Sequence, residues 1–210
     1  MLSENIATRA AAAIVDFPNK GGRGVLVDGN LILTAAHCIN YQIDGAMVLQ
    51  EDGEWNEEIE TGVGGLRVAP VAVEAVSDLA VLGSMDRQDF TEDAERFDKF
   101  CEASSSVPIC KEEFLPFEEF HVYVYDLKKA WIPAAVVQAS KYSPALWIAA
   151  DGKIEPGMSG GPIVNRSGEL VAIHAHSFGT VGTDGQSNIR GRGSRPHLAA
   201  PAWVCRRWTS

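Results

Sequence analysis

Three short segments of the chain carry side chains that together could activate a hydroxyl group. Leu31–His37 ends an apolar run in a histidine, Asp78 directly precedes the apolar run Leu79–Leu82, and Ser159 lies in a glycine-rich turn. A serine hydroxyl is a weak nucleophile until a positioned base removes its proton. Histidine suits that task because its pKa lies near neutral pH, and a buried carboxylate on its other ring nitrogen fixes the tautomer. These residue types indicate nucleophilic catalysis by Ser159, with His37 as general base and Asp78 as its orienting acid.

The turn around Ser159 reads Gly157-Met-Ser-Gly-Gly-Pro162. Glycine has no Cβ, so the backbone here can adopt conformations that other residues resist. The N–H groups of Gly157 and Ser159 can then converge on one point and form an oxyanion hole. The loss of one such donor typically costs about 10²–10³ in rate.

The same turn also fits G-x-S-x-G, the nucleophile elbow of α/β-hydrolases. That fold places its acid and its histidine after the serine, and a helix follows the serine directly. Here both candidate partners precede Ser159, and Gly160-Gly161-Pro162 opposes a helix. We therefore reject the α/β-hydrolase interpretation.

Short strands must position these residues. Strands are expected at Ala13–Phe17, Gly24–Val27, Leu31–Thr34, Ala46–Gln50, Leu66–Val73 and Leu79–Leu82, and then at Phe120–Tyr125, Trp131–Val137, Ala145–Ala149, Pro162–Val164 and Leu170–His174. Each run is short, apolar and bounded by Gly, Pro, Asp or Ser, and Asp28-Gly29-Asn30 is a hairpin signal. Strands at this spacing predict an all-β sandwich or barrel.

An acidic segment separates the two sets of strands. Apolar residues recur within it at helical spacing, which predicts an amphipathic helix over Asp89–Glu102. We therefore divide the chain into a first β subdomain at residues 1–85, an acidic and partly helical linker at 86–119, and a second β subdomain at 120–210. A short C-terminal helix is expected at Ala199–Trp208, and Gly179–Pro196 is expected to be a loop.

The segments T-A-A-H-C, D-L-A-V-L and G-x-S-G-G-P, in this order, resemble those of the trypsin/chymotrypsin-like serine peptidases, including the bacterial and HtrA-like branches. The resemblance runs from about Ala13 to the C-terminus. It implies two antiparallel six-stranded β-barrels with the site in the cleft between them. It also implies a serine endopeptidase in which His37, Asp78 and Ser159 form the triad and Gly157 and Ser159 the oxyanion hole. We expect the peptidase domain alone, without the PDZ domains of typical HtrA proteins.

The chain departs from the secreted members at two positions. Their residue before the serine is an aspartate that pairs with an N-terminus released by cleavage, whereas here it is Met158. We therefore expect Ile14 to lie in an ordinary strand and the protein to need no proteolytic maturation. Their cysteine after the histidine is disulfide-bonded to the preceding strand, whereas Gly21–Val25 holds no cysteine, so Cys38 is expected to be a free, buried thiol.

By the same resemblance, His174 lies in the pocket for the side chain that precedes the cleaved bond. An imidazole N–H there would hydrogen-bond a carboxylate or amide, which leads to the hypothesis of a preference for Glu, Asp or Gln. Lys153 and His176 are further candidates for substrate binding. The alternative is that His174 packs in its strand and the pocket takes small aliphatic side chains.

Composition narrows the remaining possibilities. The 210 residues carry a net charge of −10, which argues against general nucleic-acid binding. No apolar run is long enough to span a membrane, and the N-terminus does not resemble a signal peptide. With four scattered cysteines, we expect a cytoplasmic protein with reduced thiols.

We expect no cofactor and no metal site. Protein or peptide substrates are the expected partners, and the sequence leaves open a regulatory protein partner. The alternative function is a catalytically inactive member of the same fold that acts as a binding or regulatory module.

Overall fold

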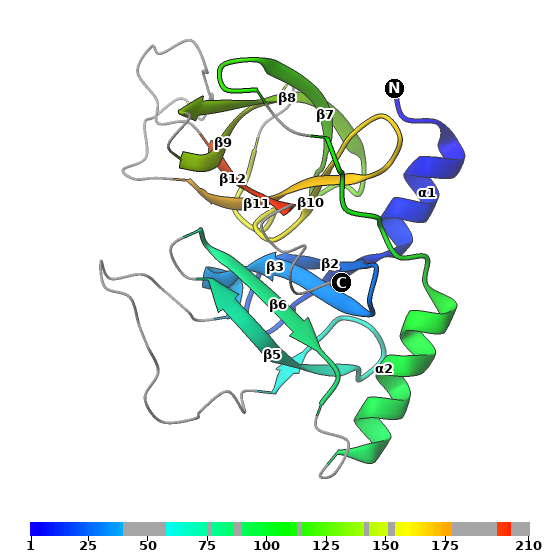
Figure 1. Ribbon diagram of the computed structural model, residues 1–210. Coiled ribbons are helices and arrows are strands. Elements are labelled where there is room, and N and C mark those ends of the chain that lie inside the picture. Colours follow the sequence, from blue (N-terminus) through cyan, green and yellow to red (C-terminus); the bar gives the residue numbers. More distant parts are fainter. Residues whose placement is uncertain are drawn as a thin grey trace.

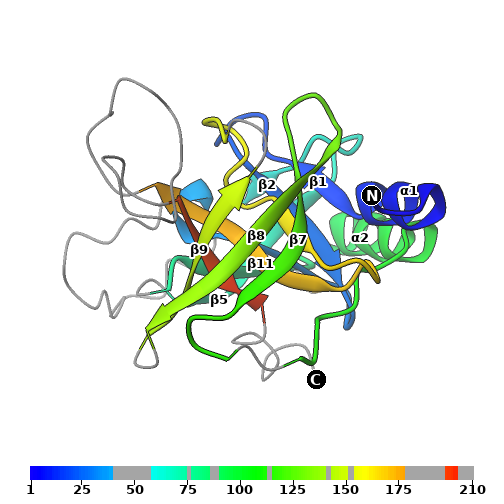
Figure 2. The same cartoon turned by 90° about the horizontal axis from the view of Figure 1, so that it is seen from above.

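The described strands form two six-stranded antiparallel sheets that lie one above the other, with both helices on the same flank (Figures 1 and 2). The structure is a computed structural model that describes residues 1–39, 58–74, 77–85, 90–112, 115–140, 143–150, 154–177 and 197–202. The first sheet has the order β1-β2-β3-β6-β5-β4, and the second closes into a barrel with the order β10-β11-β12-β9-β8-β7. The all-β double-barrel class predicted from the sequence is confirmed.

The first sheet is built from β1 (Ile14–Asp16), β2 (Arg23–Val27), β3 (Leu31–Ala35), β4 (Ile59–Glu60), β5 (Arg67–Glu74) and β6 (Leu79–Gly83). Strands β2 and β6 are buried along their whole length, which explains why they read as continuous apolar runs. A backbone hydrogen bond of 2.7 Å from the Gly62 N–H to the Asp16 carbonyl joins the segment after β4 to the end of β1. The two ends of this sheet therefore approach each other.

The second barrel is built from β7 (Glu119–Tyr125), β8 (Trp131–Ser140), β9 (Ser143–Ala150), β10 (Pro162–Val164), β11 (Leu170–Ser177) and β12 (His197–Pro201). Its apolar core includes residues from every strand and also Met158, from the turn before β10. Residues of β10, β11 and β12 also belong to the core cluster of the first sheet. The two sheets thus share buried apolar side chains across their boundary.

The sequence did not reveal the N-terminal helix α1 (Glu4–Ala12). The Ser3 hydroxyl caps it by accepting from the Ile6 N–H. The Trp131 Nε1–H of β8 donates to the Ala7 carbonyl at 3.1 Å, so α1 packs on the second barrel before the chain enters the first sheet. Ile14 is the first residue of β1 and lies in an ordinary strand that follows α1 along the chain, as the sequence predicts.

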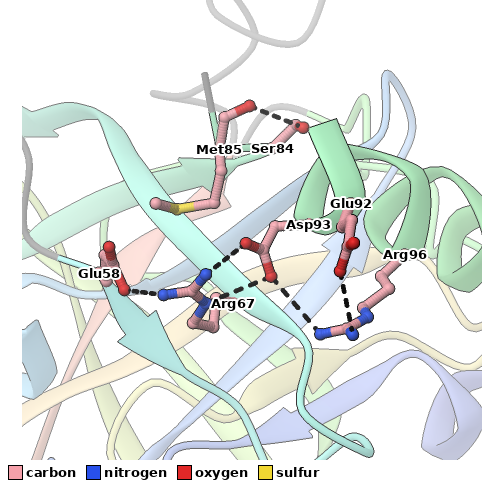
Figure 3. A network of polar contacts seen from close by, with 7 residues as sticks. All are labelled: Glu58, Arg67, Ser84, Met85, Glu92, Asp93 and Arg96. Carbon is pink, nitrogen blue, oxygen red and sulfur yellow. Dashed lines mark hydrogen bonds and ion pairs between the residues drawn. The ribbon is translucent and has the colours of Figure 1, made fainter. Parts of the chain in front are cut away.

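Helix α2 (Thr91–Ala103) confirms the amphipathic helix predicted in the acidic segment. It is attached to the first sheet through Asp93, whose carboxylate is 5% exposed and accepts from Arg67 of β5 (Figure 3). Arg67 also pairs with Glu58, and Arg96 lies near both Glu92 and Asp93. The guanidinium of Arg67 holds the pKa of the Asp93 carboxyl below its usual value. The acidic segment is therefore a packed element of the first subdomain as well as a connection.

After α2 the chain runs between the two sheets. The Val107 N–H donates to Leu26 of β2, and the Cys110 N–H donates to Leu170 of β11. The 3₁₀ turn η1 (Ala36–Ile39) follows β3 and carries His37.

Three expectations differ from the structure or lie outside the described residues. Residues Ala199–Pro201 belong to strand β12 and not to a helix, because they pair with β11 and β9. Residues 203–208 of the expected C-terminal helix lie outside the described residues, as do the strand Ala46–Gln50 and the loop Gly179–Pro196. None of the described helices is long and apolar enough to cross a membrane.

Candidate active site

The pairing of β3 with β6 places His37 beside Asp78. Ala35 lies opposite Leu79 in the antiparallel ladder, so the residues just beyond the two strand ends must meet. The Ala36 N–H donates to the Asp78 carbonyl at 3.1 Å and the His37 N–H to Asp78 Oδ1 at 2.9 Å. The imidazole Nδ1 lies 2.8 Å from Asp78 Oδ2. Asp78 thus holds the Ala36 amide with its carbonyl, and both the amide and the ring of His37 with its carboxylate.

The backbone of Asp78 is left-handed, with φ of +56°. This conformation is uncommon outside glycine, and Asp and Asn are among the residues that tolerate it best. It lets one short side chain reach both the amide and the ring of His37. When Nδ1–H donates to this carboxylate, Nε2 is the acceptor atom of the neutral ring.

The second ring nitrogen of His37 lies next to a thiol. Cys38 Sγ is 3.7 Å from Nε2, and the thiol is buried and free. Hydrogen bonds to Asp78 and then to Cys38 raise the pKa of His37 to about 10, against the opposing effect of burial. Both partners stabilise the imidazolium, because Nδ1–H donates to the carboxylate and Nε2–H to the sulfur.

The Ser159 turn is fastened to both sheets. The Arg23 N–H of β2 donates to the Ser159 carbonyl at 2.8 Å. On the other side, the Gly160 N–H donates to the His174 carbonyl at 2.7 Å, and the His174 N–H donates to the Gly161 carbonyl at 2.9 Å. Ser159 therefore sits where β2 of the first sheet faces β11 of the second barrel.

Glycine is required at position 160. Its φ is +75°, and a Cβ there would collide with the Arg23 carbonyl and with Thr34 Oγ1. Neither obstacle is the movable end of a long side chain, because one is backbone and the hydroxyl is hydrogen-bonded to it at 2.6 Å. The glycine after Ser159 is therefore explained by the close approach of the turn to β2.

The oxyanion-hole candidates lie at the start of the same turn. Gly157 has φ of +95°, and Met158 is 1% exposed within the core of the second barrel. The Glu155 N–H contacts Met158 Sδ at 3.2 Å, and the Met158 N–H donates to the Glu155 carbonyl at 3.2 Å. Within the part of the chain that the structure describes, no hydrogen bond occupies the N–H of Gly157 or of Ser159. Both donors are thus available.

Gly22 shows how close His37 and Ser159 come. A Cβ at Gly22 would collide with Cys38 Sγ and lie 2.8 Å from the Ser159 carbonyl oxygen. Cys38 in turn lies 3.7 Å from His37 Nε2, so Gly22 has the thiol that contacts the His37 ring on one side and the Ser159 carbonyl on the other. The described residues show no hydrogen bond between the Ser159 hydroxyl and Nε2. Catalytic hydrogen bonds are often long in an unliganded site and shorten with substrate.

The substrate-binding candidates are placed unequally. His174 is 3% exposed and directly hydrogen-bonded to the Ser159 turn through its backbone. Lys153 and the side chain of His176 lie outside the described residues. Among the residues that are described, no group of three or more His, Cys, Asp or Glu side chains could hold a metal ion.

Sequence reasoning missed two contacts at the site. Cys38 was expected to be a buried thiol, but its proximity to Nε2 was not foreseen. Arg23 was not identified at all, although a lone arginine between the glycines of Gly21-Gly22-Arg23-Gly24 is an unusual start for a buried strand. A charged residue at the start of an otherwise apolar strand is the one sequence feature that could have indicated a role for Arg23.

Comparison with known proteins supports the fold at low sequence identity. No family model matches the chain, and no curated protein matches its sequence. Among solved structures, the active form of the Rv3671c protease from M. tuberculosis is 14% identical with a TM-score of 0.56, over 97% of this chain and 82% of that one. A serine endoprotease from Yersinia pestis is 22% identical with a TM-score of 0.56, over 99% of this chain. The HtrA-type protease AlgW, solved with a decapeptide, is 16% identical with a TM-score of 0.57, over 98%.

The chain spans 65% of the length of the Yersinia pestis and AlgW chains. It has the fold of the trypsin-like and HtrA-like serine peptidases.

The raised pKa of His37 predicts the pH dependence of any reaction that uses this residue as a base. The neutral imidazole is the active form, so kcat/KM should increase with pH, reach half its maximum near pH 10 and level off above that pH. In Cys38→Ala one of the two contacts that stabilise the imidazolium is lost, and half-maximal kcat/KM should occur at a lower pH. The pH–rate profiles of the two proteins test this. Identical profiles would show that the thiol does not influence His37.

Two neighbouring glycines provide a matched test of the packing around Cys38. Gly21 and Gly22 both have positive φ, +78° and +87°, but a Cβ at Gly21 would meet nothing within 4 Å. Both alanine variants therefore carry the same kind of backbone strain, and Gly22→Ala alone collides with Cys38. We expect Gly22→Ala to lower kcat by at least about tenfold relative to Gly21→Ala, since small displacements of reacting groups cost up to about 10²-fold. Equal kcat values for the two variants would contradict this packing.

Proposed function

We propose that this chain is a serine endopeptidase whose catalytic residues are His37, Asp78 and Ser159. The observation that carries the proposal is the meeting of two separately built parts. Asp78 fixes the ring of His37 just beyond the paired ends of β3 and β6, and a turn of the second barrel is bonded through its Ser159 carbonyl to Arg23 of the neighbouring strand β2. The fold of the solved serine proteases supports it.

In this mechanism the Ser159 hydroxyl attacks the carbonyl carbon of a peptide bond, and its proton passes to His37 Nε2. The carbonyl oxygen becomes an oxyanion that accepts hydrogen bonds from the N–H groups of Gly157 and Ser159. His37 then gives its proton to the leaving amine, which departs as the acyl-enzyme forms. A water molecule, deprotonated by His37, releases the acid and restores the Ser159 hydroxyl. Asp78 stabilises the imidazolium in both halves of the reaction.

The buried Met158 supports a further part of the proposal, that the turn needs no cleaved N-terminus to hold it. Its side chain lies in the core of the second barrel, where an aspartate would need a buried cation.

The free thiols of Cys38, Cys101 and Cys110 support a reducing compartment, and we propose the cytoplasm.

The substrate preference rests on His174. Its backbone is bonded to the residues directly after Ser159, so its strand borders the acyl side of the scissile bond. An imidazole N–H at this position can donate to a carboxylate or amide oxygen, and a site that hydrogen-bonds a substrate group discriminates against side chains that lack it. We propose that the side chain before the cleaved bond is Glu, Asp or Gln, with Lys153 and His176 as additional contacts.

One observation favours the alternative, an inactive binding module on the same fold. The imidazolium form of His37 is stabilised on both nitrogens, and a protonated ring cannot act as a base. An active peptidase would hydrolyse peptides and would need Ser159 to do so, whereas an inactive binding module would not hydrolyse them.

Hydrolysis of a mixed peptide pool separates the two. We expect the protein to cleave peptides at pH 9 and Ser159→Ala to lose at least about 10³-fold in rate, because the nucleophile is absent. Ser167→Ala is the matched control, since Ser167 is exposed in the next turn of the barrel and lies outside the proposed machinery. Mass spectrometry of the products gives the rates. A folded protein with no turnover, or cleavage that persists in Ser159→Ala, would refute the proposal.

The same peptide pool tests the role of His174. Products should end in Glu, Asp or Gln, and His174→Gln should reduce this preference by about tenfold or more, because a lost hydrogen bond to a buried polar group has that order of effect. His121→Ala, an exposed histidine on β7, should leave the preference unchanged. Cleavage after Val or Ala in both the parent and His174→Gln would contradict the proposed specificity.

A further inference from the structure

Arg23 is a buried cation that joins the two sheets. Its side chain is 6% exposed. The guanidinium Nε–H donates to Asp16 Oδ1 at 3.1 Å, across the β1–β2 pair. Its Nη1 donates to the carbonyls of Tyr125 at 3.3 Å and Asp126 at 2.8 Å, at the end of β7 in the second barrel. The guanidinium also lies 5.3 Å from the centre of the Tyr125 ring.

The backbone of the same residue supports the Ser159 turn. The Arg23 N–H donates to the Ser159 carbonyl, and the Arg23 carbonyl accepts from Thr34 Oγ1 at 2.6 Å. The Arg23 carbonyl also lies where a Cβ at Gly160 would be. The backbone N–H and carbonyl of Arg23 are therefore both held, and the turn packs directly against them.

The guanidinium also acts on the other end of the turn. The residue after Asp126 is Leu127, and its Cδ2 lies 3.4 Å from the position of a Cβ on Gly157. The guanidinium holds the Asp126 carbonyl and thereby the start of the segment that packs on Gly157. The Arg23 backbone thus contacts the turn directly at positions 159 and 160, while its guanidinium holds the carbonyl of the residue before Leu127, whose side chain lies near Gly157.

We infer that Arg23 is a positioning residue that aligns the oxyanion turn of the second barrel with the His37–Asp78 pair of the first sheet. This inference rests on the proposed function. Arg23 takes no part in proton transfer and does not touch the reacting atoms. It determines how accurately two groups of catalytic residues, built on different sheets, face each other.

Arginine suits this role better than lysine. Its planar guanidinium presents several donors in fixed directions and can bond an aspartate and two carbonyls at once. A lysine ammonium has a different shape and cannot span the same partners. Arg23→Lys therefore keeps the positive charge and removes the planar set of donors that bonds Asp16 and the two carbonyls.

The experiment measures the rate at which a fluorophosphonate reacts with Ser159, together with kcat, KM and thermal unfolding. We expect Arg23→Lys to remain folded and to react about tenfold to a hundredfold more slowly, as displaced oxyanion donors predict. Its kcat should fall by the same factor, while KM changes by less than about threefold. The pH at half-maximal kcat/KM should stay unchanged, because His37 keeps its partners. Arg67→Lys is the matched control, an ion-paired arginine of the same sheet on the α2 side, and should lower thermal stability without slowing the labelling.

If Arg23→Lys does not fold, Asp16→Asn supplies the test, since it keeps the arginine and weakens its anchor. We expect it to be folded and to react about twofold to fivefold more slowly. Folded variants that are labelled at the parent rate would overturn the inference and leave the proposed function intact. A parent protein that is not labelled at all would overturn the proposed function and the inference together.

Discussion

The contact between the Ser159 turn and strand β2 is the constraint on which the arrangement of this molecule depends. The turn belongs to the second barrel, yet its carbonyl at Ser159 is held by an amide of the first sheet, and Gly160 lies against the next carbonyl with no room for a side chain. A hydrogen bond and a steric limit act at the same place. Together they fix the distance between the sheets at the point where the proposed chemistry occurs.

The electrostatics of the site follow from what surrounds His37. Asp78 binds one ring nitrogen and Cys38 borders the other, so the resting imidazole is stabilised in its charged form. In the secreted relatives that the sequence resembles, the cysteine at this position would be consumed by a disulfide. Here the facing residue is Gly22, and the sulfur stays free to contact the ring. A polarizable thiol thus lies beside the ring of His37.

The sequence allowed much of this to be predicted. Short apolar runs bounded by turn residues predict most of the strands, because burial on both faces of β2 and β6 leaves an unmistakable pattern. His37, Asp78 and Ser159 could be singled out by type and setting. The expected C-terminal helix was wrong over Ala199–Pro201, because pairing with two neighbouring strands overrides local helix propensity.

Arg23 and Cys38 could not be assigned from the sequence, since their roles depend on contacts with residues far away in the chain. The carbonyls that Arg23 binds lie more than a hundred positions later. Main-chain carbonyls carry no sequence signal, so a side chain that recognises them cannot be paired with its partners by pattern. The helix α1 was missed for a related reason, because its docking on Trp131 is also a backbone contact.

If the two sheets together form one activated serine, a fluorophosphonate should modify that residue alone. The most direct test is the intact mass of the protein after reaction with a fluorophosphonate, followed by peptide mapping. We expect a single adduct per chain, located on Ser159, and no adduct after unfolding in denaturant. An unmodified native protein, or adducts spread over several serines, would contradict it.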